Sequence, residues 1–565
     1  MRWTLKPEPH PKKVAVLAKA LKVEAILAKL LIQRGITTYD EAKAFFRPSL
    51  KDLHDPFLMK NMVTAVERVF KALEQGEHIL VYGDYDVDGT TAVTLMAKYL
   101  KSLGGKVATY IPDRENEGYG ISFQGIDFAH DNDCTLMIAL DCGIKAVDKI
   151  AYANKNGINV IICDHHTPGN VLPEAMAILN PKQADCGYPY KELSGCGIGF
   201  KLIQALHRAQ EKPVEELKSY LDLVATSIAA DIVPITGENR VLAYYGLQVI
   251  NRKPSIGIQA LKSELQKDRM SITDVVFQIA PRINAAGRLK HAHYAVDLLM
   301  SDDATQAQTM AIAIGDINDE RKSLDQYITG EALSQIEQQL SDFEFSTVVY
   351  NPEWHKGVVG IVASRLIENR YRPTVVLTKA NDELLVGSAR SVKGFNLYKA
   401  LEQCSDYIEQ FGGHKYAAGL RILPENLDKF RHAFENAVKS SIKAEDLEPE
   451  ITVDSEVFLS DISHKFYRII EQMAPFGPGN MRPVFMASGL RDNGYSRTVG
   501  QDHSHLKLSI VEGANPKTYN GIAFGQGESL PLVKQTFKAV FTLQENVWKD
   551  IKTIQLNVKD IKPEE

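Results

Sequence analysis

The chain has 565 residues, of which 44% are hydrophobic and 24% charged, and this composition is typical of a globular protein with several domains. Its formal net charge is −6, so an anionic partner such as nucleic acid would have to be held by local basic patches or by metal ions. The six cysteines include no C-x-x-C pair, which argues against a structural zinc site. Neither a signal sequence nor an apolar run of ~18 residues is present, so we expect a soluble, cytoplasmic protein.

The N-terminal region, residues 1–75, is predicted to be mostly helical. Helices are expected over residues 14–34 and 60–75. A further helix is expected between them, with Thr38 as its N-terminal cap. Strands and helices then alternate, which indicates a parallel sheet with helices on both faces. We assign residues 76–238 to this α/β domain, with strands expected at 78–82, 106–111, 135–140 and 158–162 and helices at 90–103 and 144–156.

Three of these strands end in ionisable residues. The first runs into Gly83-Asp-Tyr-Asp-Val-Asp-Gly89, the third into Asp141, and the fourth into Asp164-His165-His166. Alone, the first stretch is equally well a polar turn, because Asp and Gly are common in turns. Parallel strands bring their carboxyl ends to one edge, and hard divalent cations prefer oxygen ligands. The three endings together therefore predict a metal site.

Two features that follow have two interpretations each. Asp231, after a helix expected over 217–230, is either a further metal ligand or only an acid that ends a helix. The Gly-rich stretch 194–200 opens a helix that continues to Ala209. It is either a ligand-binding loop or a site of close helix packing.

Residues 239–340 are predicted to be a helical linker, with a long polar helix over 305–339. Within it, residues 280–289 are either a phosphate-binding loop or a helix cap with surface arginines. A second, smaller α/β domain is expected over 341–445. Its stretch 411–419 contains two adjacent glycines. They are interpreted either as the start of a helix whose backbone N–H groups bind an anion, or as a tight turn followed by a packed helix.

The last region, residues 446–565, changes to short alternating strands and is predicted to be a small β-barrel of the OB type. Its aromatic residues are either core residues or platforms on which bases stack; they are Tyr495, Tyr519, Phe524 and Trp548.

These motifs resemble those of a known superfamily. The Asp-rich loop, Asp141, Asp164-His165-His166 and Asp231 are similar to the four motifs of the DHH phosphoesterases, and residues 412–419 resemble the signature of the associated DHHA1 domain. Further similarity is to one branch, the RecJ single-strand exonucleases, in residues 114–120, 282–289, 387–390 and 475–480. The order of parts is also that of the RecJ branch: helical N-terminus, DHH, linker helices, DHHA1 and OB fold.

The resemblance implies a two-metal hydrolase that uses Mn²⁺ or Mg²⁺. It would cleave phosphodiester bonds of single-stranded DNA from the 5′ end to mononucleotides, in DNA repair and recombination. A helicase and a single-strand-binding protein are implied as partners, and a monomer is expected. The implied roles are Asp86 on one ion, Asp88, His165 and Asp231 on the other, Asp141 as the bridge and Asp84 as support. The place of a histidine in related small-molecule phosphoesterases is taken here by Tyr82, which leaves the ligands of the first ion least defined.

The remaining implied residues lie around the reaction. His166 would contact the scissile phosphate or hold a ligand, and Asp164 would orient a histidine ring or cap a strand end. Contacts with DNA and its phosphates are implied for Arg114, Arg282, Arg288, Ser388, Arg390 and His414.

Two other functions remain as alternatives. A phosphodiesterase for short oligonucleotides or cyclic dinucleotides would not need the predicted barrel as a platform. A non-catalytic scaffold that binds single-stranded DNA would not need intact ligands in all four motifs. The 5′ polarity is carried by the resemblance alone.

Overall fold

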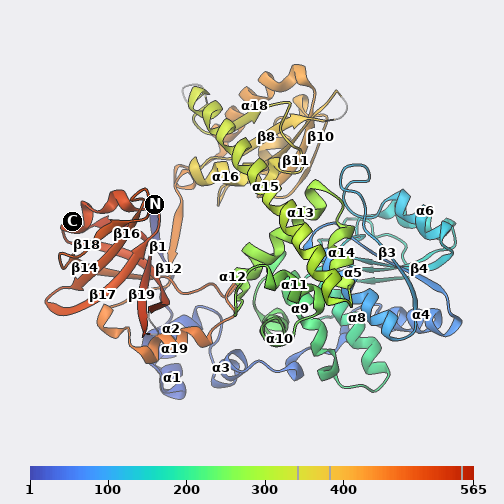
Figure 1. Ribbon diagram of the computed structural model, residues 1–565, viewed down its shortest axis with the longest axis horizontal. Helices are drawn as coiled ribbons and strands as arrows, with labels where there is room; N and C mark the ends of the chain where they lie inside the picture. The colour runs from blue at the N-terminus through green and yellow to red at the C-terminus, as the bar shows by residue number, and fades with distance from the viewer. Residues whose placement is uncertain (340–342, 381–382, 549–550, 565) are drawn as a thin grey trace. The chain divides into compact units, whose positions relative to one another are not determined.

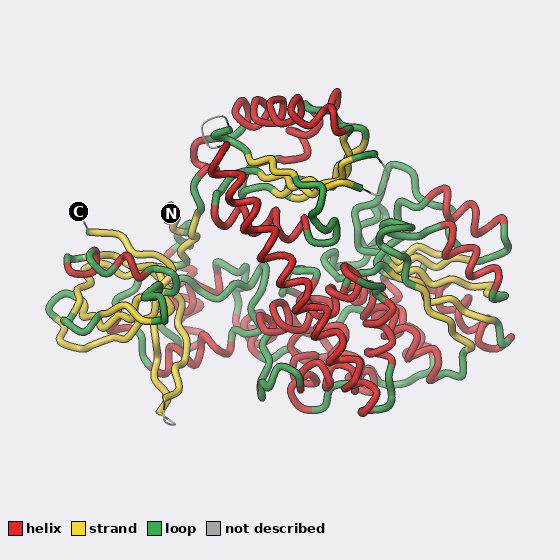
Figure 2. The backbone as a smooth tube through the Cα atoms, turned by 45° about the horizontal axis from the view of Figure 1, so that its top comes forward, coloured by secondary structure: helices red, strands yellow, loops and turns green. Residues whose placement is uncertain are grey.

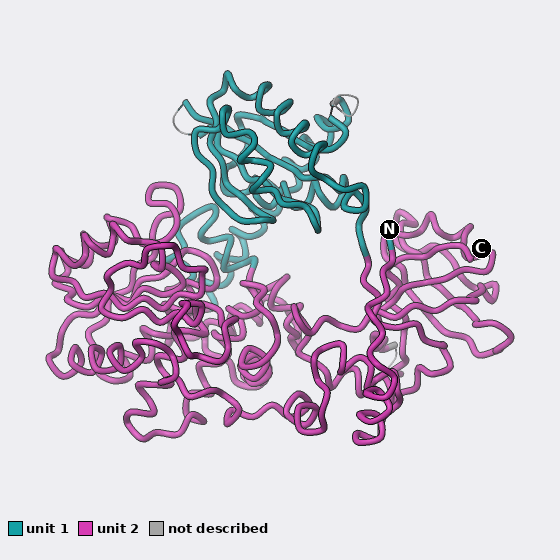
Figure 3. The backbone as a smooth tube through the Cα atoms, turned by 180° about the vertical axis from the view of Figure 1, so that it is seen from behind, with its two compact units in different colours: residues 1–2, 281–295, 308–450 teal, residues 3–280, 296–307, 451–565 magenta. Residues whose placement is uncertain are grey.

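The computed structural model describes residues 1–565 except 340–342, 381–382, 549–550 and 565. The chain forms two compact units (Figure 3). The larger unit comprises residues 3–280, 296–307 and 451–565, and the smaller unit comprises 1–2, 281–295 and 308–450. Among the residues described, no helix is both long and apolar enough to cross a membrane.

The larger unit contains a five-stranded parallel sheet with the strand order β3-β2-β4-β5-β6. Its strands are β2 (His78–Gly83), β3 (Lys106–Tyr110), β4 (Cys134–Leu140), β5 (Asn159–Cys163) and β6 (Ala177–Leu179). From β2 the chain goes to the neighbour on one side, β3, and then crosses to the neighbour on the other side, β4. Ligands of open α/β sheets bind at such a switch point, outside the carboxyl ends of the strands.

Helices cover both faces of this sheet (Figure 1). One face packs on α6 (Phe123–Asp131) and α7 (Val147–Lys155), and the other on α4 (Met62–Gln75), α5 (Val87–Ser102) and α8 (Gly195–Ala209). Helix α9 (Leu221–Ala230) packs against α5 and α8, and α10 (Gly237–Arg252) packs against α9. Both faces are buried, which explains why the strands are continuously apolar rather than alternating.

The N-terminal region differs in two ways from the prediction. The single helix expected over 14–34 is two helices, α1 (Pro11–Leu21) and α2 (Ala25–Ile32), because Lys22 adopts a left-handed conformation with φ 54° and ends the first. An unpredicted strand, β1 (Arg2–Leu5), pairs with β12 (Glu450–Val453). The predicted cap of α3 (Tyr39–Phe46) is confirmed, since Thr38 and Glu41 form a reciprocal capping box.

The C-terminal region is the predicted β-barrel (Figure 2). Its strands are β13 (Ser455–Glu456), β14 (Phe485–Asp492), β15 (Arg497–Val499), β16 (His505–Glu512), β17 (Asn515–Ala523), β18 (Phe537–Trp548) and β19 (Ile551–Pro563). Strand β14 pairs with both β18 and β16 and so closes the sheet. The five predicted strands are all present, whereas β13 and β15 are too short to have given a sequence signal. Helices α1–α3 and α19 (His464–Gln472) contribute to the same hydrophobic core as the barrel.

The smaller unit has a five-stranded mixed sheet in the order β10-β11-β9-β8-β7. Its strands are β7 (Thr347–Tyr350), β8 (Thr374–Lys379), β9 (Leu385–Arg390), β10 (Gln410–Gly413) and β11 (Ala417–Ile422). Its helices are α15 (Ala304–Gln339), which begins in the larger unit, α16 (Val359–Asn369), α17 (Leu397–Glu402) and α18 (Leu427–Ser441). The helix start expected within 411–419 is wrong, because β10 and β11 form an antiparallel hairpin there.

The linker between the two sheets is helical, as predicted. It contains α11 (Ile256–Ser263), α12 (Ile272–Asp274), α13 (Ala280–Leu289) and α14 (His293–Met300). The stretch 280–289 is therefore a helix and not the loop that was one interpretation of its sequence. The long polar helix expected over 305–339 is α15.

Candidate metal centre

The register of the parallel sheet aligns the predicted strand-end acids. Gly83, Leu140, Cys163 and Leu179 are successive partners across β2, β4, β5 and β6. The next residues along the chain are Asp84, Asp141, Asp164 and Asn180. Three acids that lie far apart in the sequence therefore leave the sheet in one row, at the switch point between β2 and β4.

Asp88 lies in the first turn of α5 and is held by the elements packed against it. Its carboxylate accepts hydrogen bonds from Gly195 N and Cys196 N, each at 2.7 Å, and from Ser227 Oγ at 2.6 Å. The first two donors are the free N–H groups at the start of α8, where a negative charge is favoured. The Gly-rich stretch 194–200 thus binds an internal carboxylate and packs closely, which supports the second of its two interpretations.

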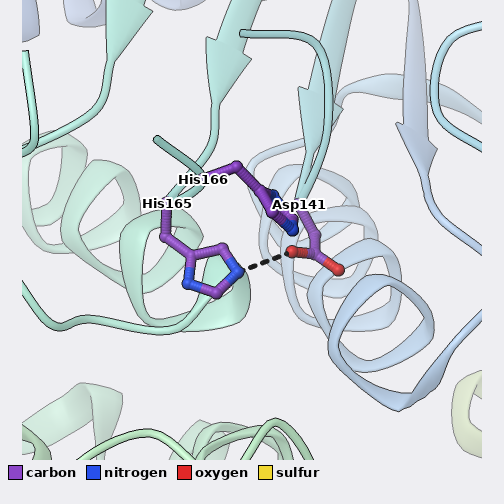
Figure 4. Close-up of side chains that lie close together, drawn as sticks. All are labelled: Asp141, His165 and His166. Atoms are coloured by element: carbon purple, nitrogen blue, oxygen red, sulfur yellow. Dashed lines mark ion pairs between the residues drawn. The ribbon is translucent and has the colours of Figure 1, made fainter. Parts of the chain in front are cut away.

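His165 lies within 4 Å of three carboxylates, and Figure 4 shows its ring facing one of them, Asp141. Its Nε2 lies 3.2 Å from Asp141 Oδ1, 3.6 Å from Asp231 Oδ2 and 3.8 Å from Asp88 Oδ2. Two groups of three ligand atoms, Asp88–His165–Asp231 and Asp141–His165–His166, each lie within 4.8 Å of one another. The tertiary structure therefore brings Asp231, from the end of α9, to the acids that follow β2 and β4.

Burial and mutual repulsion make these carboxylates hard to ionise without a cation. Burial, and then the charges of Asp88 and Asp86, raise the pKa of Asp231 to about 9. The same causes raise the pKa of Asp141 well above its ordinary value. Burial also lowers the pKa of His165, so its ring is neutral near pH 7 and has the form that binds a metal.

Asp84 and Asp86 belong to the same crowded edge. Burial and the charge of Asp86 raise the pKa of Asp84 well above its ordinary value, and burial and the charge of Asp88 raise that of Asp86. Asp86 caps α5 by accepting a hydrogen bond from Gly89 N, and Asp84 accepts a long one of 3.4 Å from Gly120 N. Neither belongs to the two close ligand groups, so their roles stay predictions.

Asp164 orients His166. Its Oδ1 lies 2.7 Å from His166 Nδ1 and accepts a hydrogen bond from His166 N, while its Oδ2 accepts one from Ile144 N. Burial alone would raise the pKa of Asp164, but the bonds with His166 lower it, and the same bonds raise the pKa of His166 against the effect of burial. Both of the geometries considered for Asp164, a ring-orienting acid and a strand-end cap, are present.

The donor set fits a divalent cation. Asp141 Oδ1 and His165 Nε2 are buried, and neither has a hydrogen-bond partner of acceptable geometry in the described part of the chain. Buried polar atoms are nearly always paired, and a cation between these oxygens and the imidazole nitrogen would satisfy them. Carboxylates are ligands suited to Mn²⁺ and Mg²⁺, and imidazole is a usual ligand of transition-metal ions.

Comparison with known proteins assigns the chain to a family. Three family models match, the DHH family N-terminal domain over residues 78–228, the DHHA1 domain over 344–440 and the RecJ OB domain over 453–560. The single-stranded-DNA-specific exonuclease RecJ of Bacillus subtilis is 36% identical over 99% of this chain and 70% of its own length. The RecJ of Dickeya dadantii is 33% identical over 95% of this chain and 96% of its own length.

The chain belongs to the RecJ family of single-stranded-DNA-specific exonucleases.

Solved RecJ structures agree with this assignment. The crystal structure of Thermus thermophilus RecJ in complex with Mn²⁺ matches the whole chain and 80% of its own length, with a TM-score of 0.86 and 28% identity. A Mg²⁺ complex of the same protein matches with a TM-score of 0.80. The predicted fold class, two α/β domains with an OB-type barrel, is therefore confirmed.

Of the phosphate-binding residues predicted from the RecJ resemblance, one lies in the larger unit. The guanidinium of Arg114 stacks on the ring of Tyr85, 4.9 Å from its centroid, in the loop between Asp84 and Asp86. Arg114 is also close enough to stabilise the charge of Asp84. The positively charged guanidinium of Arg114 therefore lies beside the Asp-rich loop of this RecJ family member.

The other five predicted residues lie in the smaller unit. Arg390 Nη1 donates to Ser388 Oγ at 2.8 Å, and both side chains lie against Gly360 in the first turn of α16. Arg288 of α13 donates to Gly357 O at 3.1 Å. Arg282 is on α13, and His414 is exposed in the turn between β10 and β11. Their contacts with DNA stay predictions.

The structure adds residues that the sequence did not indicate. Tyr119 Oη lies 3.1 Å from His166 Nε2, and Ser227 Oγ donates to Asp88. Asn180 Nδ2 donates to His166 O at 2.9 Å. Asn180 directly follows β6, in the same row as Asp84, Asp141 and Asp164. Polar residues at strand ends were the signal for those acids, and they would also have indicated Asn180 if the sequence had predicted the short strand β6. Tyr119 lies in the stretch 114–120 that resembles the RecJ branch, although no role was predicted for it, and Ser227 carries no local signal.

The barrel of the RecJ OB domain exposes two of the four predicted aromatics. Tyr495 and Phe524 are 76% and 58% exposed, whereas Tyr519 is partly buried and packs against the hydrophobic core. Trp548 ends β18, and its side chain lies outside the described part of the structure. Tyr495 and Phe524 are therefore accessible for stacking on bases, and this role stays a prediction.

Proposed function

We propose that this RecJ family member hydrolyses phosphodiester bonds of single-stranded DNA at the centre formed by Asp88, Asp141, His165 and Asp231, with two divalent cations, Mn²⁺ or Mg²⁺. The observation that carries the proposal is the group Asp88–His165–Asp231, whose ligand atoms lie within 4.8 Å of one another, with Asp141 Oδ1 3.2 Å from His165 Nε2. In this scheme Asp88, His165 and Asp231 would hold one ion and Asp86 the other, Asp141 would be a ligand of both, and Asp84 would support the cluster.

The chain's own residues have distinct tasks in this scheme. Bound cations would activate a water molecule and stabilise the leaving oxygen of the DNA. Asp88 is held by α8 and Ser227, so one ligand is fixed in place before any ion binds. His166, whose ring is aligned by Asp164 and whose Nε2 lies 3.1 Å from Tyr119 Oη, would contact the scissile phosphate or hold a ligand. Arg114 neutralises phosphate charge beside the Asp-rich loop.

Finer points of the proposal rest on the family resemblance. Cleavage starts at the 5′ end and releases mononucleotides, and Arg282, Arg288, Ser388, Arg390 and His414 bind DNA phosphates. The protein acts in the cytoplasm as a monomer, in repair and recombination, together with a helicase and a single-strand-binding protein.

The first prediction concerns the bridge. Asp141 has φ 60°, a conformation that Asn tolerates, so Asp141→Asn should preserve the fold. We expect it to abolish release of nucleotides from a single-stranded oligonucleotide in the presence of Mn²⁺. Because it removes one of several repelling carboxylates, the metal-free variant should unfold at the same or a higher temperature than the unsubstituted protein.

The controls separate the competing functions. Asp148→Asn, on the surface of α7, should behave like the unsubstituted protein. Full activity of Asp141→Asn would contradict the two-metal scheme, and absence of Mn²⁺-dependent cleavage in the unsubstituted protein would favour a scaffold. Faster cleavage of a dinucleotide than of a long strand would favour the small-substrate alternative, and DNA labelled at one end or the other would test the polarity.

A further inference from the structure

The loop that carries Asp231 joins α9 to α10 over residues 231–236, and we call it the Asp231 loop. On the α9 side its start is fixed, because Asp231 N donates to Ser227 O at 2.9 Å. Beyond Asp231 the chain leaves the helix, with Ile232 at φ 56°. The position of the Asp231 carboxylate therefore depends also on how the far end of the loop is held.

Part of that far end is held by neighbouring residues of the parallel-sheet domain. Tyr190 Oη donates to Pro234 O at 3.3 Å and lies 3.0 Å from Thr236 Oγ1. Asn239 Nδ2 donates to the same Pro234 carbonyl at 3.0 Å. Ile235, between these two contacts, is buried with 1% of its surface exposed, and its backbone N–H points elsewhere.

The partner of Ile235 is a turn in the segment between α19 and β14, residues 477–480. Ile235 N donates to Pro478 O at 2.7 Å. A Cβ atom on Gly477 would lie 2.5 Å from Ile235 Cγ1, and one on Gly479 would lie 2.8 Å from Thr236 Cγ2. The turn therefore approaches the Asp231 loop so closely that a side chain at Gly477 could not be accommodated without displacing Ile235.

The 477–480 turn is itself rigidly held. Gly477 and Asn480 exchange two backbone hydrogen bonds around a proline and a glycine with φ 74°, the pattern of a type II turn. Asn480 is 2% exposed, and its Nδ2 donates to Met473 O and Pro475 O at 2.8 and 2.9 Å. Arg240 of α10 donates to Met473 O and Ala474 O, and Arg34 donates to Asn480 Oδ1.

We propose that the 477–480 turn is a positioning element of the metal centre: by fixing Ile235, it holds the Asp231 loop where Asp231 Oδ2 lies 3.6 Å from His165 Nε2. The inference rests on the metal-binding role proposed for Asp231. It assigns a task to the motif Pro475-Phe-Gly-Pro-Gly-Asn480, which follows the first strand of the barrel in sequence and contacts the chain four residues from a metal ligand.

The test is Mn²⁺ binding to the full-length chain without DNA, measured from the electron paramagnetic resonance signal of free Mn²⁺. Gly477→Ala inserts a methyl group against Ile235 and should weaken one class of Mn²⁺ sites about tenfold, at the lower end of what loss of an outer-shell partner costs. Its affinity for a single-stranded oligonucleotide without divalent ions should not change. The double variant Gly477→Ala/Ile235→Ala, which makes room for that methyl group, should recover most of the Mn²⁺ affinity.

The matched control is Gly187→Ala, at an exposed glycine where a Cβ would meet nothing within 4 Å, and it should bind Mn²⁺ like the unsubstituted protein. If Gly477→Ala does not fold, Pro478→Ala loosens the same turn without a clash and should produce a smaller shift. Unchanged Mn²⁺ binding in the folded variant, or a shift that Ile235→Ala does not relieve, would overturn the inference. Failure of the unsubstituted protein to bind Mn²⁺ would instead overturn the proposed metal centre.

Discussion

At the scale of single residues, Asp88 shows how a buried carboxylate is kept ready for a cation. Two of its three donors are backbone N–H groups of α8, which a change of side chain leaves in place, but the third is the hydroxyl of Ser227. Ser227 Oγ also lies 2.6 Å from Ser194 Oγ, so its rotamer is constrained. Such outer contacts set the orientation of a ligand and with it the affinity for the metal.

Ser227→Ala should therefore raise the Mn²⁺ concentration that half-saturates cleavage by about tenfold. The free energy of unfolding of the metal-free protein should fall by about 1–3 kcal/mol, the cost of removing one partner of a buried hydrogen bond. Titration of nuclease activity with Mn²⁺ and thermal unfolding without metal measure the two effects. Ser102→Ala is the control, because its hydroxyl bonds Tyr99 O at the other end of α5. Equal Mn²⁺ requirements in the two variants would contradict the role given to Ser227.

At the scale of elements, α8 approaches the centre through glycines one helical turn apart. A Cβ atom on Gly195 would lie 2.5 Å from Asp141 Cβ and 2.7 Å from Asp141 Oδ1. A Cβ on Gly199 would instead meet Leu140 Cδ2 at 2.9 Å, which is the end of a flexible side chain. The first glycine thus faces Asp141, a proposed metal ligand, and the second faces the strand that precedes Asp141.

Gly195→Ala and Gly199→Ala form a matched pair on one helix. We expect Gly195→Ala to reduce the cleavage rate about 100-fold, because Asp141 or the start of α8 must move and a misplaced ligand costs up to that factor. Gly199→Ala should keep most of the activity, since Leu140 can change rotamer. Rates on a single-stranded oligonucleotide at saturating Mn²⁺ measure the difference. Similar losses in both variants would show that overpacking of α8, not contact with Asp141, decides the effect.

At the scale of the whole molecule, the N-terminal helices and the C-terminal barrel fold as parts of one core. Leu17, Leu27 and Leu30 of α1 and α2 belong to the same buried cluster as Phe485 and Phe541 of the barrel. The ends of the chain are thus joined by packing, and the 477–480 turn belongs to a segment whose stability depends on both.

Leu30→Ala should lower the free energy of unfolding of the larger unit by about 2–5 kcal/mol, the usual cost of a buried Leu→Ala substitution. Leu30 is fully buried, whereas Val16 of α1 is 69% exposed. Val16→Ala is therefore the control and should change stability only slightly. Urea unfolding followed by circular dichroism compares the two variants. If Leu30→Ala unfolded at the same urea concentration as the unsubstituted protein, this result would contradict a core shared by the N-terminal helices and the barrel.

Much of the fold and part of the site could be predicted from local patterns. The strands of the parallel sheet are apolar runs bounded by turn residues, and an acid that ends such a strand is visible in the sequence. Once these strands pair in parallel, their carboxyl ends meet at one edge of the sheet, and Asp84, Asp141 and Asp164 lie in one row. The hairpin at 411–419 was predicted wrongly as a helix start, because two glycines suit either, and only the pairing of β11 with β9 and β10 decides between them.

The sequence by itself determined the family and the α/β and barrel architecture, because these depend on contiguous motifs and strand patterns. It also predicted the acids and histidines of the proposed centre, from strand ends and, for Asp231, from the family resemblance. Only the tertiary structure showed that α8 and Ser227 hold Asp88 and that Asp164 aligns His166 rather than His165. It also showed that Ile235, in the loop of Asp231, contacts the 477–480 turn. These contacts join segments far apart in the chain, and nothing in the local pattern of Ser227 or Gly477 specifies its partner. Their positions follow from packing, which the whole fold decides at once.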